Sequence, residues 1–188
     1  MEDPRVIVAD SDALEIACST NNLTLVKHLI EDGYVVGERI GENALVSSLI
    51  SPGTEVMVYL LSHSEPSSPR GLLHHAVAAN NIQAVRLLLT DPRIAPKTED
   101  SSALVAAILR CKYDILRLLL RDGRFDPSAN QEEALELAVS VGDLVTVQIL
   151  LADRRVNASA NDNIAIKLAD YYGNDKIVAR LRDYGARM

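Results

Sequence analysis

Apolar residues recur along the chain at a fixed internal distance. Six times, an apolar pair is followed by a leucine at a constant offset: Ala13 by Leu29, Ala44 by Leu60, Leu72 by Leu88, Ala103 by Leu119, Ala134 by Leu150 and Ala165 by Leu181. The numbers of each pair's first residue and its leucine always differ by 16. The numbers of successive first residues differ by 31, 28, 31, 31 and 31. A period of this kind predicts a chain built from repeated supersecondary units.

The predicted core follows from columns of this repeat, counted from the first residue of each pair as position 0. Positions 0, 1, 13 and 16 are apolar in all six units, although only 48% of the chain is hydrophobic. At that composition a column of six is wholly apolar by chance roughly one time in a hundred. Position 4 is small in every unit: Ala17, Ser48, Ala76, Ala107, Ala138 and Ala169. A small residue repeated at one position predicts two helices that approach closely.

Each unit is predicted to contain two short helices joined by a tight turn. Helix N-capping residues are common before position 0 and at position 9, and Gly or Asn often precedes position 9, where a tight turn needs positive φ. The residues before position 0 are Asp12, Asn43, Gly71, Ser102, Glu133 and Ile164. At position 9 stand Asn22, Gly53, Asn81, Lys112, Asp143 and Asn174. The predicted fold is therefore all-α: an α-solenoid of about six helix–turn–helix repeats, without strands beyond loop bridges.

A single repeat domain is predicted over residues 1–188. The repeats are expected at about 12–33, 43–64, 71–92, 102–123, 133–154 and 164–186. Residues 1–11 are interpreted as the remnant of a preceding repeat or as an N-terminal extension. The reason is that Asp3-Pro4-Arg5-Val6 is similar to Asp91-Pro92-Arg93-Ile94, a loop that follows a second helix.

The two ends of the array differ in polarity. The sixth repeat replaces apolar columns with Asp170, Asp175 and Arg182, which is typical of a terminal repeat whose outer face meets water. The first repeat keeps apolar residues such as Cys18 and Leu23 in the same columns. We expect a monomer, with self-association through the first repeat as an alternative. The chain is then either a fragment of a longer array or a short protein with a poorly capped first repeat.

The pattern resembles the ankyrin repeat family. The constant offset between apolar pair and leucine, the Ala at position 4, the Gly or Asn turn and the leucine cluster carry the resemblance, which covers about residues 12–186. His74, in Gly71-Leu72-Leu73-His74, falls where the Thr-Pro-Leu-His motif of the family has its histidine. The chain departs from the family in lacking the Thr-Pro pair and in a period two residues shorter than the usual ~33. The missing residues fall in the loops, so the β-hairpin fingers of the family are expected to be short or irregular.

The resemblance implies that a concave groove is lined by the end of each first helix, at positions 6 and 7. We call the side chains at these positions the helix-end set: Ser19, Thr20, Ile50, Ser51, Ala78, Ala79, Leu109, Arg110, Ser140, Val141, Tyr171 and Tyr172. Only Arg110 is charged, whereas a purely solvated face should carry many charges. Tyr and Arg are enriched at binding hot spots, so this set predicts a partner-binding surface. The alternatives are that loops half-bury the set and that Tyr171 and Tyr172 cover the end of the core.

Catalytic and cofactor signatures are absent from the sequence. It contains no Gly-rich phosphate loop, no zinc-protease motif and no Gly-x-Ser-x-Gly. His74 and His75 are adjacent, so they point about 100° apart on a helix and cannot readily share a metal. The acidic pairs Glu99-Asp100 and Glu132-Glu133 lack the ligand spacing of a calcium loop. We therefore expect no catalytic residue, no cofactor and no metal site.

Charge and cysteine content narrow the class of partner and the compartment. The formal net charge of −7 argues against a nucleic-acid surface, and no apolar run approaches the ~18 residues of a membrane span. Two cysteines, Cys18 and Cys111, are too few for a disulfide framework, which predicts a reducing, cytoplasmic location. Each cysteine is expected to be a buried small hydrophobe. A Ser-Pro pair at Ser68 is interpreted as part of a plain loop, with phosphorylation as the alternative.

The sequence thus predicts a non-catalytic protein–protein interaction scaffold. It would bind a protein partner through the concave face and loops of the repeat stack, and neither nucleic acid nor membrane. The alternative is an inert spacer or the terminal portion of a larger multidomain repeat protein. An enzyme with an unrecognised site is a third interpretation, favoured by no residue pattern.

Overall fold

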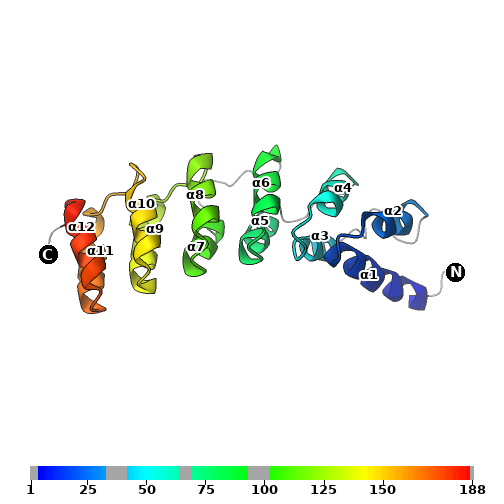
Figure 1. Ribbon diagram of the computed structural model, residues 1–188, viewed down its shortest axis with the longest axis horizontal. Helices are drawn as coiled ribbons and strands as arrows, with labels where there is room; N and C mark the ends of the chain where they lie inside the picture. Colours follow the sequence, from blue (N-terminus) through cyan, green and yellow to red (C-terminus); the bar gives the residue numbers. More distant parts are fainter. Residues whose placement is uncertain (1–3, 33–41, 64–68, 93–101, 187–188) are drawn as a thin grey trace. The chain divides into compact units, whose positions relative to one another are not determined.

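The computed structural model describes residues 4–32, 42–63, 69–92 and 102–186, and within them the chain is all-α (Figure 1). The described residues form twelve helices and no strand. The helices are α1 (Pro4–Ser19), α2 (Leu23–Glu31), α3 (Glu42–Ser48), α4 (Glu55–His63), α5 (Pro69–Ala78), α6 (Ile82–Thr90), α7 (Ser102–Leu109), α8 (Tyr113–Asp122), α9 (Ala129–Val141), α10 (Leu144–Leu151), α11 (Ala160–Tyr171) and α12 (Asp175–Asp183). The predicted fold class, with about six helix–turn–helix repeats, is confirmed.

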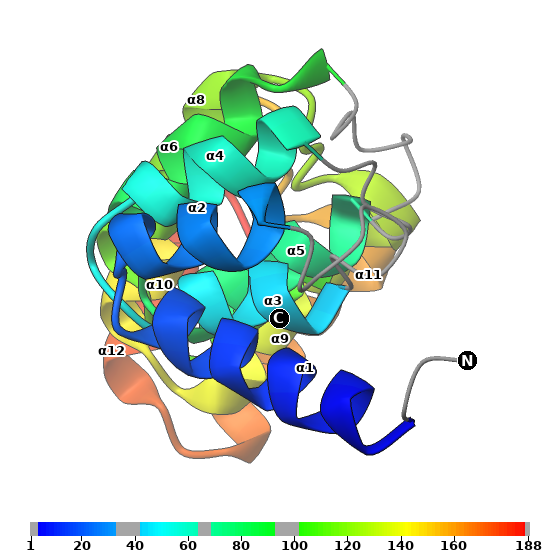
Figure 2. The same cartoon turned by 90° about the vertical axis from the view of Figure 1, so that its right-hand side faces the viewer.

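The helices are grouped in two compact units, Met1–Ile94 and Ala95–Met188. In the first unit α3 packs against both α1 and α5, and α2 packs against α4. Figure 2 shows α2 and α4 on one side of this unit and α1 and α3 on the other. In the second unit α9 packs against both α7 and α11, and α10 against both α8 and α12. Within each unit, therefore, first helices form one layer and second helices another.

The core of each unit contains most of the predicted columns, and at position 0 only Ala13 is not buried. Every side chain at positions 1, 4, 13 and 16 is buried. Position 4 confirms the close approach of the helices, because the five alanines there are completely buried. Ser48 is the polar member of the column, and its hydroxyl donates to the carbonyl oxygen of Leu45 at 2.6 Å. A small polar residue is tolerated here because it satisfies its own hydrogen bond within the helix.

The turns between paired helices use a left-handed residue at position 8 in five of the six repeats. Asn21, Asn80, Gly142 and Gly173 have positive φ, as their residue types predict, and Cys111 also does, with φ 50°. The second repeat has Pro52 at this position, and the proline ring holds φ negative. Its turn is longer as a result: α3 ends at Ser48 and α4 begins only at Glu55.

Three of the predicted N-caps of the second helices make a side-chain cap bond. Asn22 accepts from the backbone N–H of Leu25, Asn81 from that of Ala84, and Asp143 from those of Val145 and Thr146. Lys112 and Asn174 occupy the cap position without a side-chain cap bond. The prediction for Gly53 is wrong, because the longer turn of the second repeat moves the helix start to Glu55.

The predicted N-caps of the first helices are wrong. Asp12 lies inside α1, which already begins at Pro4, and Ser102 is the first residue of α7 rather than its cap. In the fifth and sixth repeats the cap positions belong to Ser128 and Ser159. The first helices therefore begin earlier than the caps suggested. In α11 the extra turn is left-handed, since residues 161–163 all have φ between 49° and 58°.

The described part of the chain begins with a helix of the first repeat, α1, and its last helix is α12 of the sixth repeat. Residues 4–11, expected to resemble a loop, are helical and continue into the first repeat as part of α1. In the sixth repeat Asp170, Asp175 and Arg182 are exposed. Ser68 lies outside the described residues, as do the segments 33–41 and 93–101, where short fingers were expected.

Candidate protein-binding surface

The helix-end set lies at the C-terminal ends of the first helices and in the turns that follow. None of its members is buried. This geometry follows from the repeat, because positions 4 and 5 face the core and the next two side chains rotate away from it. Ile50, Leu109 and Tyr171 are each more than half exposed. The alternative interpretation, in which loops half-bury the set, therefore does not describe these three side chains.

In the unit 95–188 most members of this set are apolar or aromatic, and the exceptions are Arg110 and Ser140. Leu109 is 53% exposed, Tyr171 82% and Tyr172 50%, and Val141 is also exposed. The rings of Tyr171 and Tyr172 meet edge to face, with centroids 5.2 Å apart. Because α9 packs between α7 and α11, the helix ends that carry these side chains are neighbours. Exposed aromatic and aliphatic side chains gathered in this way are typical of a protein-binding surface.

In the unit 1–94 the same positions are mostly small or polar. Ser19 and Thr20 both donate to the carbonyl oxygen of Ile16, at 3.0 and 2.9 Å, so their hydroxyls are satisfied within α1. Ile50 is the large apolar member and is 70% exposed. Together with Ala79 it lines a shallow cavity of about 280 Å³ beside the turn of the third repeat. The apolar character of the set is thus concentrated in the unit 95–188.

Hydrogen bonds between neighbouring turns hold these helix ends in place. Asn21 donates from Nδ2 to Oε2 of Glu55 at 2.6 Å and accepts from the backbone N–H of Val56 at 3.3 Å. The bond from Asn21 lowers the pKa of the Glu55 carboxyl. In the unit 95–188, Tyr113 donates from its hydroxyl to Asp143 of the next repeat at 3.2 Å. These contacts were not predicted from the sequence, because they join residues 30 to 35 positions apart.

A second set of contacts joins the loops that follow the second helices. Asp122 accepts from Arg124, with Nη2 to Oδ2 at 2.8 Å. Asp153 accepts from Arg155 through two bonds of 2.9 and 2.6 Å. Arg155 also reaches back to the preceding repeat. Its guanidinium donates to the carbonyl oxygens of Leu120 and Phe125, at 3.0 Å each. The Asp-x-Arg triplets that begin at Asp91, Asp122 and Asp153 recur with the repeat, and sequence reasoning interpreted them only as a turn-rich loop, without predicting the pairing of Asp with Arg.

The cysteines occupy two different environments. Cys18 is completely buried, as predicted for a small hydrophobe, and burial raises the pKa of its thiol to about 12. Cys111 is instead a partly exposed turn residue, so its predicted role as a core hydrophobe is wrong. Desolvation and the nearby Asp143 carboxylate raise the pKa of its thiol. A raised pKa keeps a thiol protonated and poorly nucleophilic.

The described residues contain neither a cluster of metal-binding side chains nor a membrane-spanning helix. Among them no three His, Cys, Asp or Glu side chains gather where they could hold a metal ion. The two adjacent histidines predicted not to share a metal, His74 and His75, have ring centroids 5.9 Å apart in an edge-to-face arrangement. None of the helices in this part of the chain combines the length and hydropathy needed to span a bilayer.

Comparisons with known proteins identify the repeat. Residues 73–162 match a family model described as ankyrin repeats (3 copies). Among solved structures, the chain is similar to the crystal structure of the ankyrin repeat domain of Bcl-3, a unique member of the IkappaB protein family. The TM-score is 0.71 at 23% sequence identity, over 93% of this chain and 86% of that one. A search of curated proteins gave no match.

Proposed function

We propose that the chain is a non-catalytic ankyrin repeat module that binds a protein partner, because residues 73–162 match ankyrin repeats and the fold is that of an ankyrin repeat domain. Ankyrin repeat domains are typically protein-binding modules, because stacked repeats present an extended surface whose residues vary without disturbing the core. The partner would contact the helix-end set and the adjoining loops.

The observation that carries this proposal is the exposure of large apolar side chains at one structural position. Of the ten exposed large hydrophobic side chains in the described residues, five belong to the helix-end set. Those five are Ile50, Leu109, Val141, Tyr171 and Tyr172. Four of the five lie in the unit 95–188, at the adjoining ends of α7, α9 and α11. Burying Tyr and Leu side chains supplies much of the free energy of a typical protein–protein contact.

Charge and cysteine chemistry support a protein ligand and a reducing compartment. The net charge of −7 disfavours a polyanionic ligand such as nucleic acid. Both cysteines are free, and the more buried of them is inaccessible to oxidants. These thiols support an intracellular location, where cysteines stay reduced, as part of the proposal.

Affinity capture with matched variants tests the proposal. The bait is the full chain, compared with the double variant Leu109→Glu/Tyr171→Glu, whose substitutions put two carboxylates on the proposed surface. The control is Leu25→Glu/Tyr184→Glu, which adds the same charge at two exposed apolar side chains outside the set. We expect one or more proteins to be captured by the wild-type chain and by the control, and to be lost with the double variant.

The competing interpretation is a spacer whose repeats bind nothing. It predicts that the wild-type chain and both double variants capture the same background of proteins. Circular dichroism of all three chains is needed beside the capture, since equal helix content excludes unfolding as the cause of a loss.

A further inference from the structure

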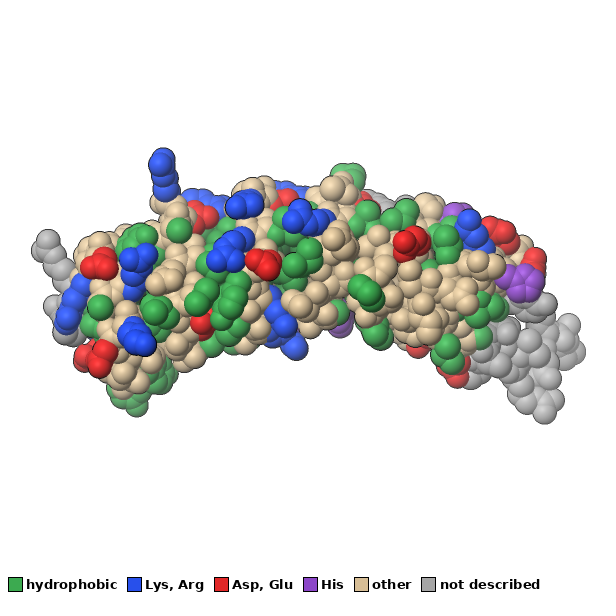
Figure 3. All heavy atoms as spheres, in the orientation of Figure 1, with side chains coloured by type: hydrophobic (Ala, Val, Ile, Leu, Met, Phe, Trp, Pro, Cys, Tyr) green, Lys and Arg blue, Asp and Glu red, His purple; other side chains and the backbone are tan. Residues whose placement is uncertain are grey.

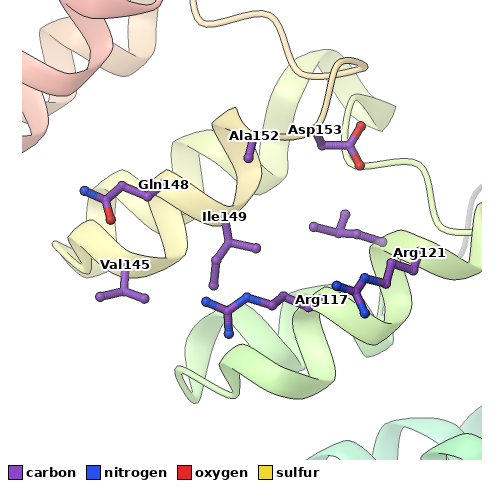
Figure 4. A pocket seen from close by; sticks show the side chains of 8 residues that line it. Arg117, Arg121, Val145, Gln148, Ile149, Ala152 and Asp153 are labelled. Carbon is purple, nitrogen blue, oxygen red and sulfur yellow. The ribbon is translucent and has the colours of Figure 1, made fainter.

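The second helices of the unit 95–188 enclose a groove on a different part of the repeat from the helix-end set. A cavity of about 420 Å³ lies between α8 and α10 (Figure 4). Its lining residues are Arg117, Leu120, Arg121, Val145, Gln148, Ile149, Ala152 and Asp153. A space of this size admits side chains of a bound peptide.

The lining combines an apolar floor with two cations on one rim. Leu120 comes from α8 and Val145 and Ile149 come from α10, and all three are partly exposed. Figure 4 shows the guanidinium groups of Arg117 and Arg121 extending from α8 toward α10 over this floor. The two arginines are four residues apart, so they project from the same face of α8, with Cβ atoms about 5–6 Å apart.

The acidic groups near the groove are already engaged by other side chains. The carboxylate of Asp153 accepts two hydrogen bonds from Arg155, which neutralises the one acid in the lining. Arg117 has an exposed contact of 3.3 Å with Asp114. Arg121 makes no ion pair within the described part of the chain. The rim of the groove therefore keeps positive charge for a ligand.

This local charge contrasts with the acidity of the whole protein. The chain has a net charge of −7, but the segment 95–188 is close to neutral, because it holds 13 of the 19 Lys and Arg side chains beside 14 of the 26 Asp and Glu side chains. Figure 3 shows Lys and Arg side chains (blue) on the surface of the unit 95–188, interspersed with Asp and Glu side chains (red). A basic rim on an otherwise acidic protein selects for a ligand that places carboxylates at this one place.

We propose that the α8–α10 groove binds an acidic amphipathic helix of a partner protein. The aliphatic side chains of that helix would lie on Leu120, Val145 and Ile149. Two of its carboxylates, four residues apart, would accept from Arg117 and Arg121. A helix suits this groove because its residues i, i+3, i+4 and i+7 lie on one face and can pack together into a groove between two helices. Inorganic phosphate or another small anion would leave the apolar floor uncovered.

The proposal is tested by selecting peptides on the full chain. The probe is a displayed library of helical peptides of about 15 residues, randomised on one face. Depletion on the variant Val145→Glu removes peptides that bind elsewhere. Val145 is 39% exposed, so its replacement leaves no buried cavity, and thermal melting verifies the fold. Peptides that depend on Val145 are then titrated by fluorescence anisotropy.

The expected result is enrichment of peptides that carry Leu or Ile together with Glu or Asp pairs four residues apart. Arg117→Gln/Arg121→Gln should weaken their binding about tenfold or more. Arg182→Gln, an exposed arginine on α12, is the charge control and should change the affinity by less than about twofold.

Three results would overturn the proposal. The first is a selection in which no peptide distinguishes the wild-type chain from Val145→Glu. The second is a set of Val145-dependent peptides without paired carboxylates, or with an affinity that the double arginine variant leaves unchanged. The third is complete displacement of the peptide by inorganic phosphate, which would make the groove an anion site.

Discussion

The guanidinium of Arg155 lies 3.0 Å from the carbonyl oxygen of Phe125, a residue of the preceding repeat 30 positions earlier. A second nitrogen of the same group is 3.0 Å from the carbonyl oxygen of Leu120, near the end of α8. Helix C-termini leave carbonyl oxygens without intrahelical partners, and a cation is a favourable partner for them. Arg155 thus links consecutive loops while its carboxylate partner Asp153 fixes its orientation.

Replacing Arg155 should destabilise the unit 95–188. We expect Arg155→Met to lower the free energy of unfolding by about 2 kcal/mol, because two carbonyl oxygens and one carboxylate lose a charged donor. Arg155→Lys should recover less than half of that loss, since one ammonium cannot reproduce the planar fork. Chemical denaturation measures both. Arg154→Met, at the exposed neighbouring arginine, is the control and should cost less than about 0.5 kcal/mol. Equal losses at Arg154 and Arg155 would contradict the assignment.

The buried amide of Asn81 should matter more than an ordinary helix cap. Asn81 caps α6 through Ala84, and its Nδ2 also donates to the carbonyl oxygens of Leu49 at 3.1 Å and Ser51 at 2.7 Å. Asn81→Ala removes the cap and leaves carbonyl oxygens of the second repeat without a donor, so we expect a loss of about 2–3 kcal/mol.

The matched comparison for Asn81 is Asn22→Ala. Asn22 occupies the same position in the first repeat, is exposed and makes the cap bond to Leu25. This variant should lose about 1 kcal/mol in the same denaturation measurement. A loss at Asn22 as large as that at Asn81 would show that capping alone explains both effects.

Truncation of the position 16 leucines should be graded along the array. Leu119, Leu150 and Leu181 are all completely buried. Leu119→Ala and Leu150→Ala should each cost about 2–5 kcal/mol, because they leave a cavity in a packed core. Leu181→Ala should cost less, because α12 packs on α10 and α11 on one side only and the surroundings can collapse into the space. Thermal and chemical unfolding of the three variants would contradict this account if the losses were equal.

Acid should weaken the loops through their Asp–Arg pairs. Hydrogen bonds from Arg124 lower the pKa of Asp122, and those from Arg155 lower the pKa of Asp153, below the ordinary value of 3.8. Their contribution to stability is therefore complete above that value and is lost as the pH falls through the folded-state pKa. The free energy of unfolding should decline between about pH 5 and about pH 2. Asp153→Asn should be less stable at neutral pH and decline less steeply. Equal slopes for the variant and the wild-type chain would exclude Asp153 from the effect.

The repeat period and the core could be predicted from sequence because burial constrains every unit alike. Positions 1, 4, 13 and 16 hold the same residue class six times, and all are buried. The exposure of Leu109 and Tyr171 follows from the same helical geometry, because position 6 comes directly after positions 4 and 5, which face the core. The family resemblance predicts a protein-binding module, whereas the binding residues and the partner are not given by it.

The features that sequence reasoning missed depend on contacts between repeats. Asp12 is a good capping residue, yet it lies within α1, because packing of a long helix on α3 overrides the local preference. Cys111 adopts positive φ although its residue type disfavours it, because the repeat requires a left-handed turn at position 8. The reach of Arg155 and the groove between α8 and α10 depend on side chains from different repeats, which a pattern along the chain does not place together.

Site-specific photocrosslinking tests the central claim, binding of a protein through the helix-end set, most directly. A benzophenone amino acid is placed at Leu109 or Tyr171, and at the exposed control sites Leu25 and Val58, and each chain is irradiated with the protein that affinity capture yields. We expect crosslinks to that protein from Leu109 and Tyr171 and none from the control sites. Crosslinks from the control sites alone, or equal yields from all four, would contradict the proposed surface.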